Sequence, residues 1–203
     1  MQDPQSSSDT LERLERAEQL KLMGQHQAAL DILEELLIED PSNVSALEEV
    51  ADNELSLEQF DRAKAAAQRA LALDADSYTA EYIMGFLASH DENWKSAITF
   101  LQRANLMKPN NAEILRCLGW ALFNHGKRTQ GIVTLERALN LDNVNALTLC
   151  DLGVAYLQVR NFGKAKTLFL RTLDLDPDNV RARECVQAVE RLERTLREQQ
   201  EVV

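Results

Sequence analysis

A period of 34 residues runs without insertion from Thr10 to Asn179, and it constrains the fold more than any other feature. Five consecutive windows cover residues 10–43, 44–77, 78–111, 112–145 and 146–179. Position 20 of every window is small; the residues are Ala29, Ala63, Ala97, Gly131 and Ala165. Position 8 is small as well; the residues are Ala17, Ala51, Gly85, Gly119 and Gly153. Small residues at fixed points let helices approach closely, so the period predicts a stacked repeat array that offers a binding surface rather than a chemical pocket.

Each window contains two apolar stretches of helical spacing, separated by a short polar break. Gly24 and Gly126 stand in this break, where the end of a helix favours a left-handed residue. Glu58, Glu92 and Arg160 occupy the same point in the other windows. We therefore expect those three turns to be closed in a different way.

The ends of the windows carry helix-stop and helix-start signals. Pro41, Pro109 and Pro177 follow the second stretch of their windows, and proline cannot continue a helix. Every window then closes with a residue suited to cap the next helix: Asn43, Ser77, Asn111, Asn145 and Asn179. The sequence thus predicts an all-α fold, an α-solenoid of five helix pairs.

The windows also predict the organisation of the chain. Because neighbouring repeats bury each other's apolar faces, we expect residues 10–179 to form one domain. Residues 1–9 are polar and predict a disordered tail. Residues 180–203 predict a C-terminal helix and tail that cap the last repeat, with an apolar stripe of Val186, Val189, Leu192 and Leu196. A coiled-coil contact with another chain is the alternative role for this helix.

Composition restricts the classes of partner. The net charge is −11 and the pI about 4.8, so the chain repels nucleic acid and anionic lipid, and a basic partner is favoured over an acidic one. No apolar segment approaches the length of a membrane span, so no membrane insertion is expected. Three cysteines without a CxxC pair favour a reducing compartment. We expect a cytoplasmic protein.

The reactive residues form no catalytic or metal-binding pattern in the sequence. His26, His90 and His125 lie in different windows, without metal-ligand spacing. The cysteines, interpreted as small buried apolar residues, are Cys117, Cys150 and Cys185. The sequence has no Gly-rich phosphate loop, HExxH or GxSxG motif. We expect no enzyme activity, no cofactor and no metal site.

The fifth window carries a family pattern: Leu149, Leu152, Gly153, Tyr156, Ala165, Phe169 and Pro177. The fourth window repeats much of it with Leu115, Leu118, Gly119, Leu122, Gly131 and Leu135. With this pattern, residues 10–179 resemble the tetratricopeptide repeat family. Arg13 and Glu54 depart from the pattern at positions that are normally apolar. The resemblance implies a right-handed superhelix of antiparallel helix pairs. The first helix of each pair lines a concave groove that holds an extended or helical peptide segment.

By the same resemblance, positions 2, 5, 9, 12 and 13 of each window face the groove. The acidic end of the groove would contain Glu18, Glu48 and Asp52. The aromatic and apolar end would contain Tyr82, Phe86, Arg116, Trp120, Phe123, Asn124, Val154 and Leu157. Trp120 carries most of this prediction, because Trp is a frequent anchor of recognition surfaces. The alternative is that Trp120 packs between adjacent first helices; at position 17, packing is the expected role of Phe60, Trp94 and Phe162.

These residues predict a non-catalytic interaction module, an adaptor, scaffold or co-chaperone-like protein. Its ligand would be an amphipathic, partly basic segment of another protein. The groove positions are too acidic for the acidic tails of heat-shock chaperones, because Glu15, Glu18, Glu48, Glu49 and Asp52 would repel them. Two alternatives stay open. One is a self-assembling scaffold, in which the N-terminal tail or C-terminal helix of one copy enters the groove of another. The other is a secretion chaperone for an apolar partner.

Overall fold

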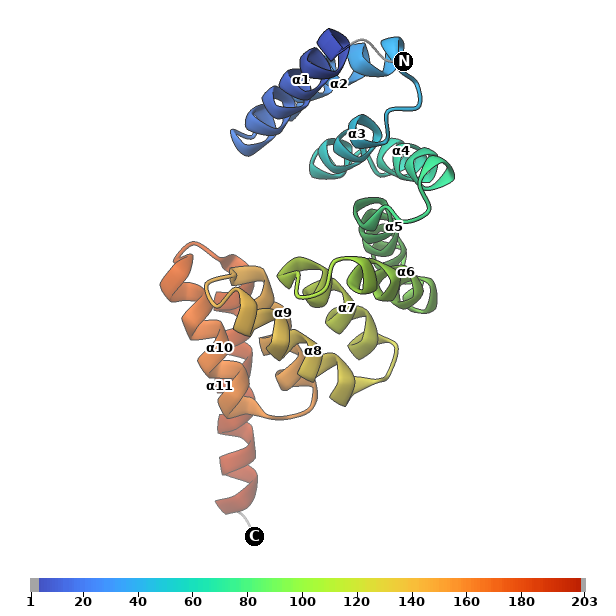
Figure 1. Ribbon diagram of the computed structural model, residues 1–203. Coiled ribbons are helices and arrows are strands. Elements are labelled where there is room, and N and C mark those ends of the chain that lie inside the picture. Colours follow the sequence, from blue (N-terminus) through green and yellow to red (C-terminus); the bar gives the residue numbers. More distant parts are fainter. Residues whose placement is uncertain (1–3, 202–203) are drawn as a thin grey trace. The chain divides into compact units, whose positions relative to one another are not determined.

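The computed structural model describes the backbone of residues 4–201 and the side chains of residues 8–195. Within these residues every regular element is an α-helix, which confirms the all-α prediction (Figure 1). The helices are α1 (Pro4–Leu22), α2 (His26–Glu39), α3 (Val44–Ser56), α4 (Phe60–Leu73), α5 (Tyr78–His90), α6 (Trp94–Met107), α7 (Ala112–Asn124), α8 (Arg128–Leu141), α9 (Ala146–Gln158), α10 (Phe162–Leu175) and α11 (Val180–Glu201). Each 34-residue window therefore supplies two helices.

The described chain divides into two compact units, where the sequence predicted one continuous domain. Unit 1 ends at Pro109 and unit 2 begins at Asn110, in the turn between the third and fourth windows. Asn110 has a left-handed backbone with φ of 60°. The physical reason for the division is that each unit contains buried apolar clusters of its own.

Unit 1 consists of three helix hairpins, α1–α2, α3–α4 and α5–α6. The second helix of one hairpin packs against the first helix of the next, and α1, α3 and α5 also contact one another in succession. The core lies between these helices and is rich in alanine, because the small residues of α4 allow α3 and α5 to approach it. Larger side chains such as Leu33, Leu47 and Ile83 fill the remaining space.

Unit 2 consists of the hairpins α7–α8 and α9–α10, followed by the single helix α11. Its core surrounds Phe169, which is fully buried. The helix α11 packs on α10 and contacts α9, and its Ala182 and Val189 are also fully buried. This packing covers apolar surface of the fifth window, while Leu196 of the expected stripe lies outside the described side chains.

The capping prediction is confirmed at all five points. The side-chain oxygen of each predicted residue accepts a hydrogen bond from the backbone N–H three residues later; the residues are Asn43, Ser77, Asn111, Asn145 and Asn179. Each bond satisfies one N–H group that the helix itself leaves without a partner. The start of every following helix is therefore set by a local signal in the sequence.

The prediction about the turns inside the windows was wrong. Glu58, Glu92 and Arg160 adopt the left-handed conformation, with φ of 58°, 56° and 62°, as Gly24 and Gly126 do. In all five turns, the backbone N–H of the residue after the left-handed one donates to a carbonyl five residues earlier in the chain. This shared bond closes the helix end, and it holds the non-glycine residues in a conformation that is costly for them.

The small residues of the period lie where helices touch. A Cβ atom added to Gly131 would come within 2.6 Å of the backbone nitrogen of Phe123. At position 8, a Cβ on Gly85, Gly119 or Gly153 would meet the residue at position 24 of the same window. The period thus records the close approach of the two helices of each hairpin.

The N-terminal boundary differs from the prediction. Helix α1 begins at Pro4, so residues 4–9 are helical rather than a disordered tail, and residues 1–3 lie outside the described residues. Proline is well tolerated in the first turn of a helix, because its missing N–H has no helical partner there and its φ already suits a helix.

Candidate functional site

The acidic side chains predicted for the groove lie in unit 1, on α1 and α3. Glu18 is exposed on α1. Asp52 on α3 is paired, because the ammonium group of Lys21 lies 3.0 Å from its Oδ2 and 2.7 Å from Oε2 of Glu49. Burial lowers the pKa of Lys21, but its hydrogen bonds to Glu49 and Asp52 outweigh this, and the pKa is raised. The sequence prediction overlooked that Lys21 neutralises part of this acidic surface.

Glu48 is partly buried beside the start of α5. The hydroxyl group of Ser77, which caps α5, donates a hydrogen bond to its carboxylate. Burial raises the pKa of Glu48, the hydrogen bond from Ser77 opposes this, and Asp74 and Glu49 raise the pKa further. Glu48 is therefore partly committed to contacts within the chain.

The two aromatic residues predicted for unit 1, Tyr82 and Phe86, lie on α5. Both are partly buried. Tyr82 packs against the core of the unit. They stand one helical turn apart, on the same side of α5, where each retains some exposed surface.

In unit 2, Trp120 and Phe123 of α7 differ in exposure. Phe123 is only 2% exposed and belongs to the core, which is at odds with its predicted place on the surface. Its backbone nitrogen and Cβ lie against Gly131 of α8. Trp120 is half-buried, and its ring stacks on Phe123 with centroids 6.5 Å apart and an interplanar angle of 17°. The side-chain amide of Asn124 donates to the carbonyl of Trp120.

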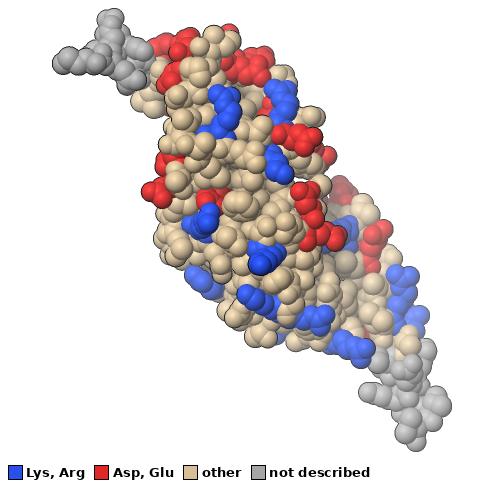
Figure 2. Space-filling model, turned by 90° about the vertical axis from the view of Figure 1, so that its right-hand side faces the viewer, with Lys and Arg blue, Asp and Glu red and all other residues tan. Residues whose placement is uncertain are grey.

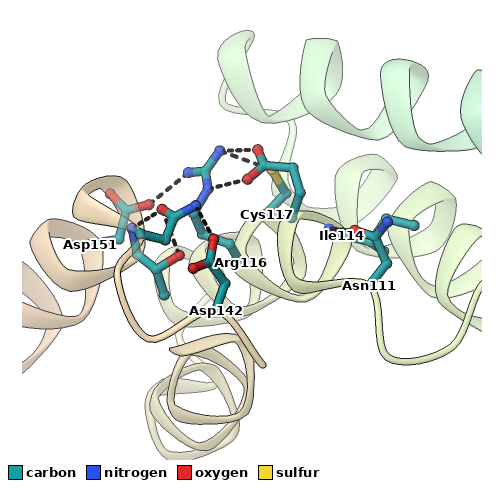
Figure 3. A network of polar contacts seen from close by, with 9 residues as sticks. Asn111, Ile114, Arg116, Cys117, Asp142 and Asp151 are labelled. Atoms are coloured by element: carbon teal, nitrogen blue, oxygen red, sulfur yellow. Dashed lines mark hydrogen bonds and ion pairs between the residues drawn. The ribbon is translucent and has the colours of Figure 1, made fainter. Parts of the chain in front are cut away.

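Arg116 forms a polar network rather than a free surface cation. Its Nη1 lies 2.8 Å from Oδ2 of Asp151 on α9, and its Nε donates to Glu113 over 3.0 Å. Figure 3 shows Arg116 directed toward Asp151, with Cys117 beside it. Its side chain is only 12% exposed and that of Asp151 9%. The pair therefore links α7 to α9 as an internal contact.

Burial is the main influence on the pKa values of Asp151 and Cys117 in this network. Burial raises the pKa of Asp151, and the opposing effect of Arg116 only partly offsets it. Burial also raises the pKa of the Cys117 thiol to about 12, so this cysteine stays protonated at neutral pH. Cys150 is buried and Cys185 is partly buried, and all three cysteines are free thiols. The interpretation as buried apolar residues is confirmed for Cys117 and Cys150.

The last two predicted residues, Val154 and Leu157, lie on α9. Both are partly buried and pack against the core of unit 2. The position-17 aromatic residues begin the second helices, as expected. The ring of Phe60 contacts that of His90, with centroids 4.4 Å apart and the ring planes tilted by 42°, and Phe162 packs against the core of unit 2.

Charges of both signs share the molecular surface. Figure 2 shows Lys and Arg side chains interspersed with Asp and Glu over the face that it displays. Within the part of the chain that the structure describes, no three His, Cys, Asp or Glu side chains gather in a way that could hold a metal ion. Among the described helices, none combines the length and the apolar content needed to cross a membrane.

Comparison with known protein families identifies one of the five windows. Residues 146–179, the fifth window, match the family model described as tetratricopeptide repeat. The fifth window is therefore a tetratricopeptide repeat. No curated protein sequence is significantly similar to it.

Solved structures share the tetratricopeptide repeat fold of this chain. YrrB, described as a TPR protein with an unusual peptide-binding site, is 23% identical, with a TM-score of 0.63 over 86% of this chain and 90% of YrrB. TTC0263, a TPR protein of Thermus thermophilus, is 20% identical, with a TM-score of 0.70 over 88% of this chain and 97% of TTC0263. A chain of the APC/C hetero-tetramer Cut9–Hcn1 is 19% identical, with a TM-score of 0.79 over 85% of this chain and 35% of its own length.

The sequence prediction missed two clefts that lie between consecutive tetratricopeptide repeats, away from the predicted groove positions. One lies in unit 1 between α2, α3 and α4, with a volume of about 450 Å³. The other lies in unit 2 between α8, α9 and α10, with a volume of about 560 Å³. A signal was present, because Glu54, one of the departures from the family pattern, lines the first cleft.

Proposed function

We propose that this tetratricopeptide repeat protein is a non-catalytic protein–protein interaction module. The observation that carries the proposal is the fold itself, combined with Trp120, a large aromatic side chain left half-buried on a first helix. Large aromatic residues that are only partly covered are frequent anchors of binding surfaces. Stacking on Phe123 holds the ring in one orientation, which reduces the entropy cost of using it as an anchor.

Each unit offers its own first-helix face to a partner segment. In unit 2 the proposed face consists of Trp120, Val154 and Leu157, with Asn124 beside Trp120. In unit 1 it consists of Tyr82 and Phe86, with Glu18, Glu48 and Asp52 as acidic neighbours. The exposed charge of Glu18 supports a preference for a partly basic segment, since Asp52 already has Lys21 as a partner.

The test uses the wild type, Trp120→Ala and Val133→Ala as baits in affinity capture. Calorimetry then measures the affinity of the captured partner for each of them. Val133 is a matched control, because it is 50% exposed on α8, the second helix of the same repeat. Trp120→Ala is expected to weaken binding by about 2 kcal/mol, roughly 30-fold, while circular dichroism stays unchanged. Equal affinity for both variants and the wild type would remove the first-helix face of unit 2 from the proposal.

A self-assembling scaffold is the second candidate. It is favoured by apolar side chains left exposed on the first and last described helices. Leu11 and Leu22 of α1 are 58% and 79% exposed, and Val180 and Leu192 of α11 are 61% and 45% exposed. Light scattering over a concentration series tests it, because a molecular mass that stays monomeric up to high concentration contradicts assembly.

A further inference from the structure

The two clefts described above are built from the same repeat positions. Their polar walls combine position 25 of one window with positions 11 and 19 of the next. In unit 1 these residues are Glu34, Glu54 and Arg62, and in unit 2 they are Glu136, Tyr156 and Lys164. The two walls differ in type only at position 11, where unit 1 has a carboxylate and unit 2 a phenol.

In unit 2 the phenol completes a chain of hydrogen bonds. The hydroxyl of Tyr156 donates to Oε1 of Glu136 over 2.5 Å and accepts from Nζ of Lys164 over 2.9 Å. The ring also receives the ammonium group of Lys164 on its face, 4.6 Å from the centroid. Unit 2 therefore shows that a phenol hydroxyl group suits a wall made of a carboxylate and a cation.

In unit 1 the wall supplies no hydrogen-bond donor to Glu54. The side chain of Glu54 is 1% exposed, and its Oε1 lies 2.8 Å from Nη2 of Arg62. That contact is an ion pair outside hydrogen-bond geometry, and among the described residues neither carboxylate oxygen of Glu54 has a hydrogen-bond partner. The same Nη2 donates to Glu34 over 3.0 Å, so the guanidinium group is shared between two carboxylates. A buried acceptor without a donor is costly, and a ligand that supplies the donor removes this cost.

The rest of the cleft selects for a neutral, apolar ligand. Leu37, Ile38 and Val50 line it, and Ile38 is 80% exposed. Over the whole cleft, Arg62 and Arg69 balance the charges of Glu34 and Glu54, so the cleft has no net charge to attract a cation. A ring with one hydroxyl group matches both the apolar surface and the missing donor.

We propose that the cleft of unit 1 binds a tyrosine side chain of a partner protein. Its phenol O–H donates to Glu54, and its ring packs against Ile38 and Val50. In this way the partner supplies the group that Tyr156 supplies from within the chain in unit 2. The site goes beyond the proposed first-helix faces, because α2 and α4 form most of it.

The proposal is tested by titrating the full chain with small molecules while its backbone amide signals are monitored by NMR. The probes are 4-methylphenol, the side chain of tyrosine; toluene, which lacks the hydroxyl; and butylammonium, which mimics lysine. We expect 4-methylphenol to shift amides of α2, α3 and α4 around the cleft, and to bind at least about fivefold tighter than toluene, the effect of one hydrogen bond. Toluene binding as tightly would overturn the role of Glu54, and tighter binding of butylammonium would overturn the choice of ligand.

Two variants of the cleft and one control variant make the test independent of any single folding effect. Glu54→Tyr places a phenol of the chain in the cleft and is expected to weaken 4-methylphenol binding at least about tenfold. Ile38→Asp changes an exposed residue and is expected to weaken it as well. Tyr156→Phe alters only the cleft of unit 2 and should leave binding unchanged. Unweakened binding in Ile38→Asp, or a loss of binding in Tyr156→Phe, contradicts the assignment to unit 1.

Discussion

Gly131→Ala tests whether the 34-residue period records helix contacts. A Cβ at this position would lie 2.6 Å from the backbone nitrogen of Phe123 and 2.7 Å from the carbonyl oxygen of Gly119. Backbone atoms cannot rotate away, so α7 and α8 have to separate. Overpacking of this kind costs about 3 kcal/mol at the upper end of its usual range, and the better helix propensity of alanine returns about 1 kcal/mol. The expected net loss is about 2 kcal/mol of unfolding free energy.

Gly163→Ala is the matched control. Gly163 lies in α10, and a Cβ there would meet nothing within 4 Å. Without a clash only the propensity term remains, so this variant is expected to gain up to about 1 kcal/mol. Both variants therefore add one methyl group to a helix of unit 2, with opposite expected signs.

The measurement is urea unfolding, which is monitored with two probes, circular dichroism and tryptophan fluorescence. The second probe is made specific for unit 2 by working in a Trp94→Phe background, which leaves Trp120 as the only tryptophan. Gly131→Ala should lower the midpoint without a change in slope. If it equals or exceeds the stability of Gly163→Ala, the close approach of α7 and α8 is not what requires glycine at position 20.

Three further predictions concern polar groups and turns. Arg116→Ala leaves Asp151 buried without its cation and is expected to cost about 3 kcal/mol, measured by urea unfolding; Arg116→Met with Asp151→Leu should recover at least half of this loss. Arg160→Gly removes an unfavourable left-handed residue and should raise stability by about 0.5–1 kcal/mol, whereas Gly24→Ala should lower it. Burial raises the pKa of Glu54 above its ordinary value of 4.5, with Arg62 opposing and Glu34 adding to this. Its contribution to stability is therefore lost as the pH rises through the folded pKa, so the stability of Glu54→Gln relative to wild type should increase with pH from about 4.5 upward. A difference that is independent of pH would contradict this reasoning.

The fold could be predicted from local signals that repeat. Asn43 and Asn145 cap helices because of bonds to a backbone N–H three residues away, and such bonds depend on the neighbouring sequence alone. The turns were harder to predict, because the left-handed backbone of Glu92 is imposed by the hydrogen bonds of the whole turn rather than by the residue type. The division into two units was not visible in a period that continues unchanged across Pro109.

The predicted site was less accurate, because exposure depends on neighbouring helices. Position 12 places Phe123 on the groove side by family analogy, yet close packing of α7 on α8 makes it part of the core. Trp120, three residues earlier, keeps part of its surface open. A periodic pattern gives the direction of a side chain from its own helix, but not how much of it the next helix covers.

Several ion pairs between repeats recur at two separations that can be read from the sequence. Arg116 pairs with Asp151, 35 residues later, and Lys21 pairs with Glu49, 28 residues later. Arg62 likewise reaches back 28 residues to Glu34. A separation of 34 residues leads to the equivalent position of the next repeat. Separations of 35 and 28 residues differ from this by one and by six residues, and they lead to positions on the same side of the hairpin. Opposite charges at these two separations are therefore candidates for pairing between neighbouring repeats. Because the rule uses only residue types and spacing, it identifies Arg116 and Lys21 as internal partners, and it leaves Glu18 as the acid of the first-helix face that is open to a partner.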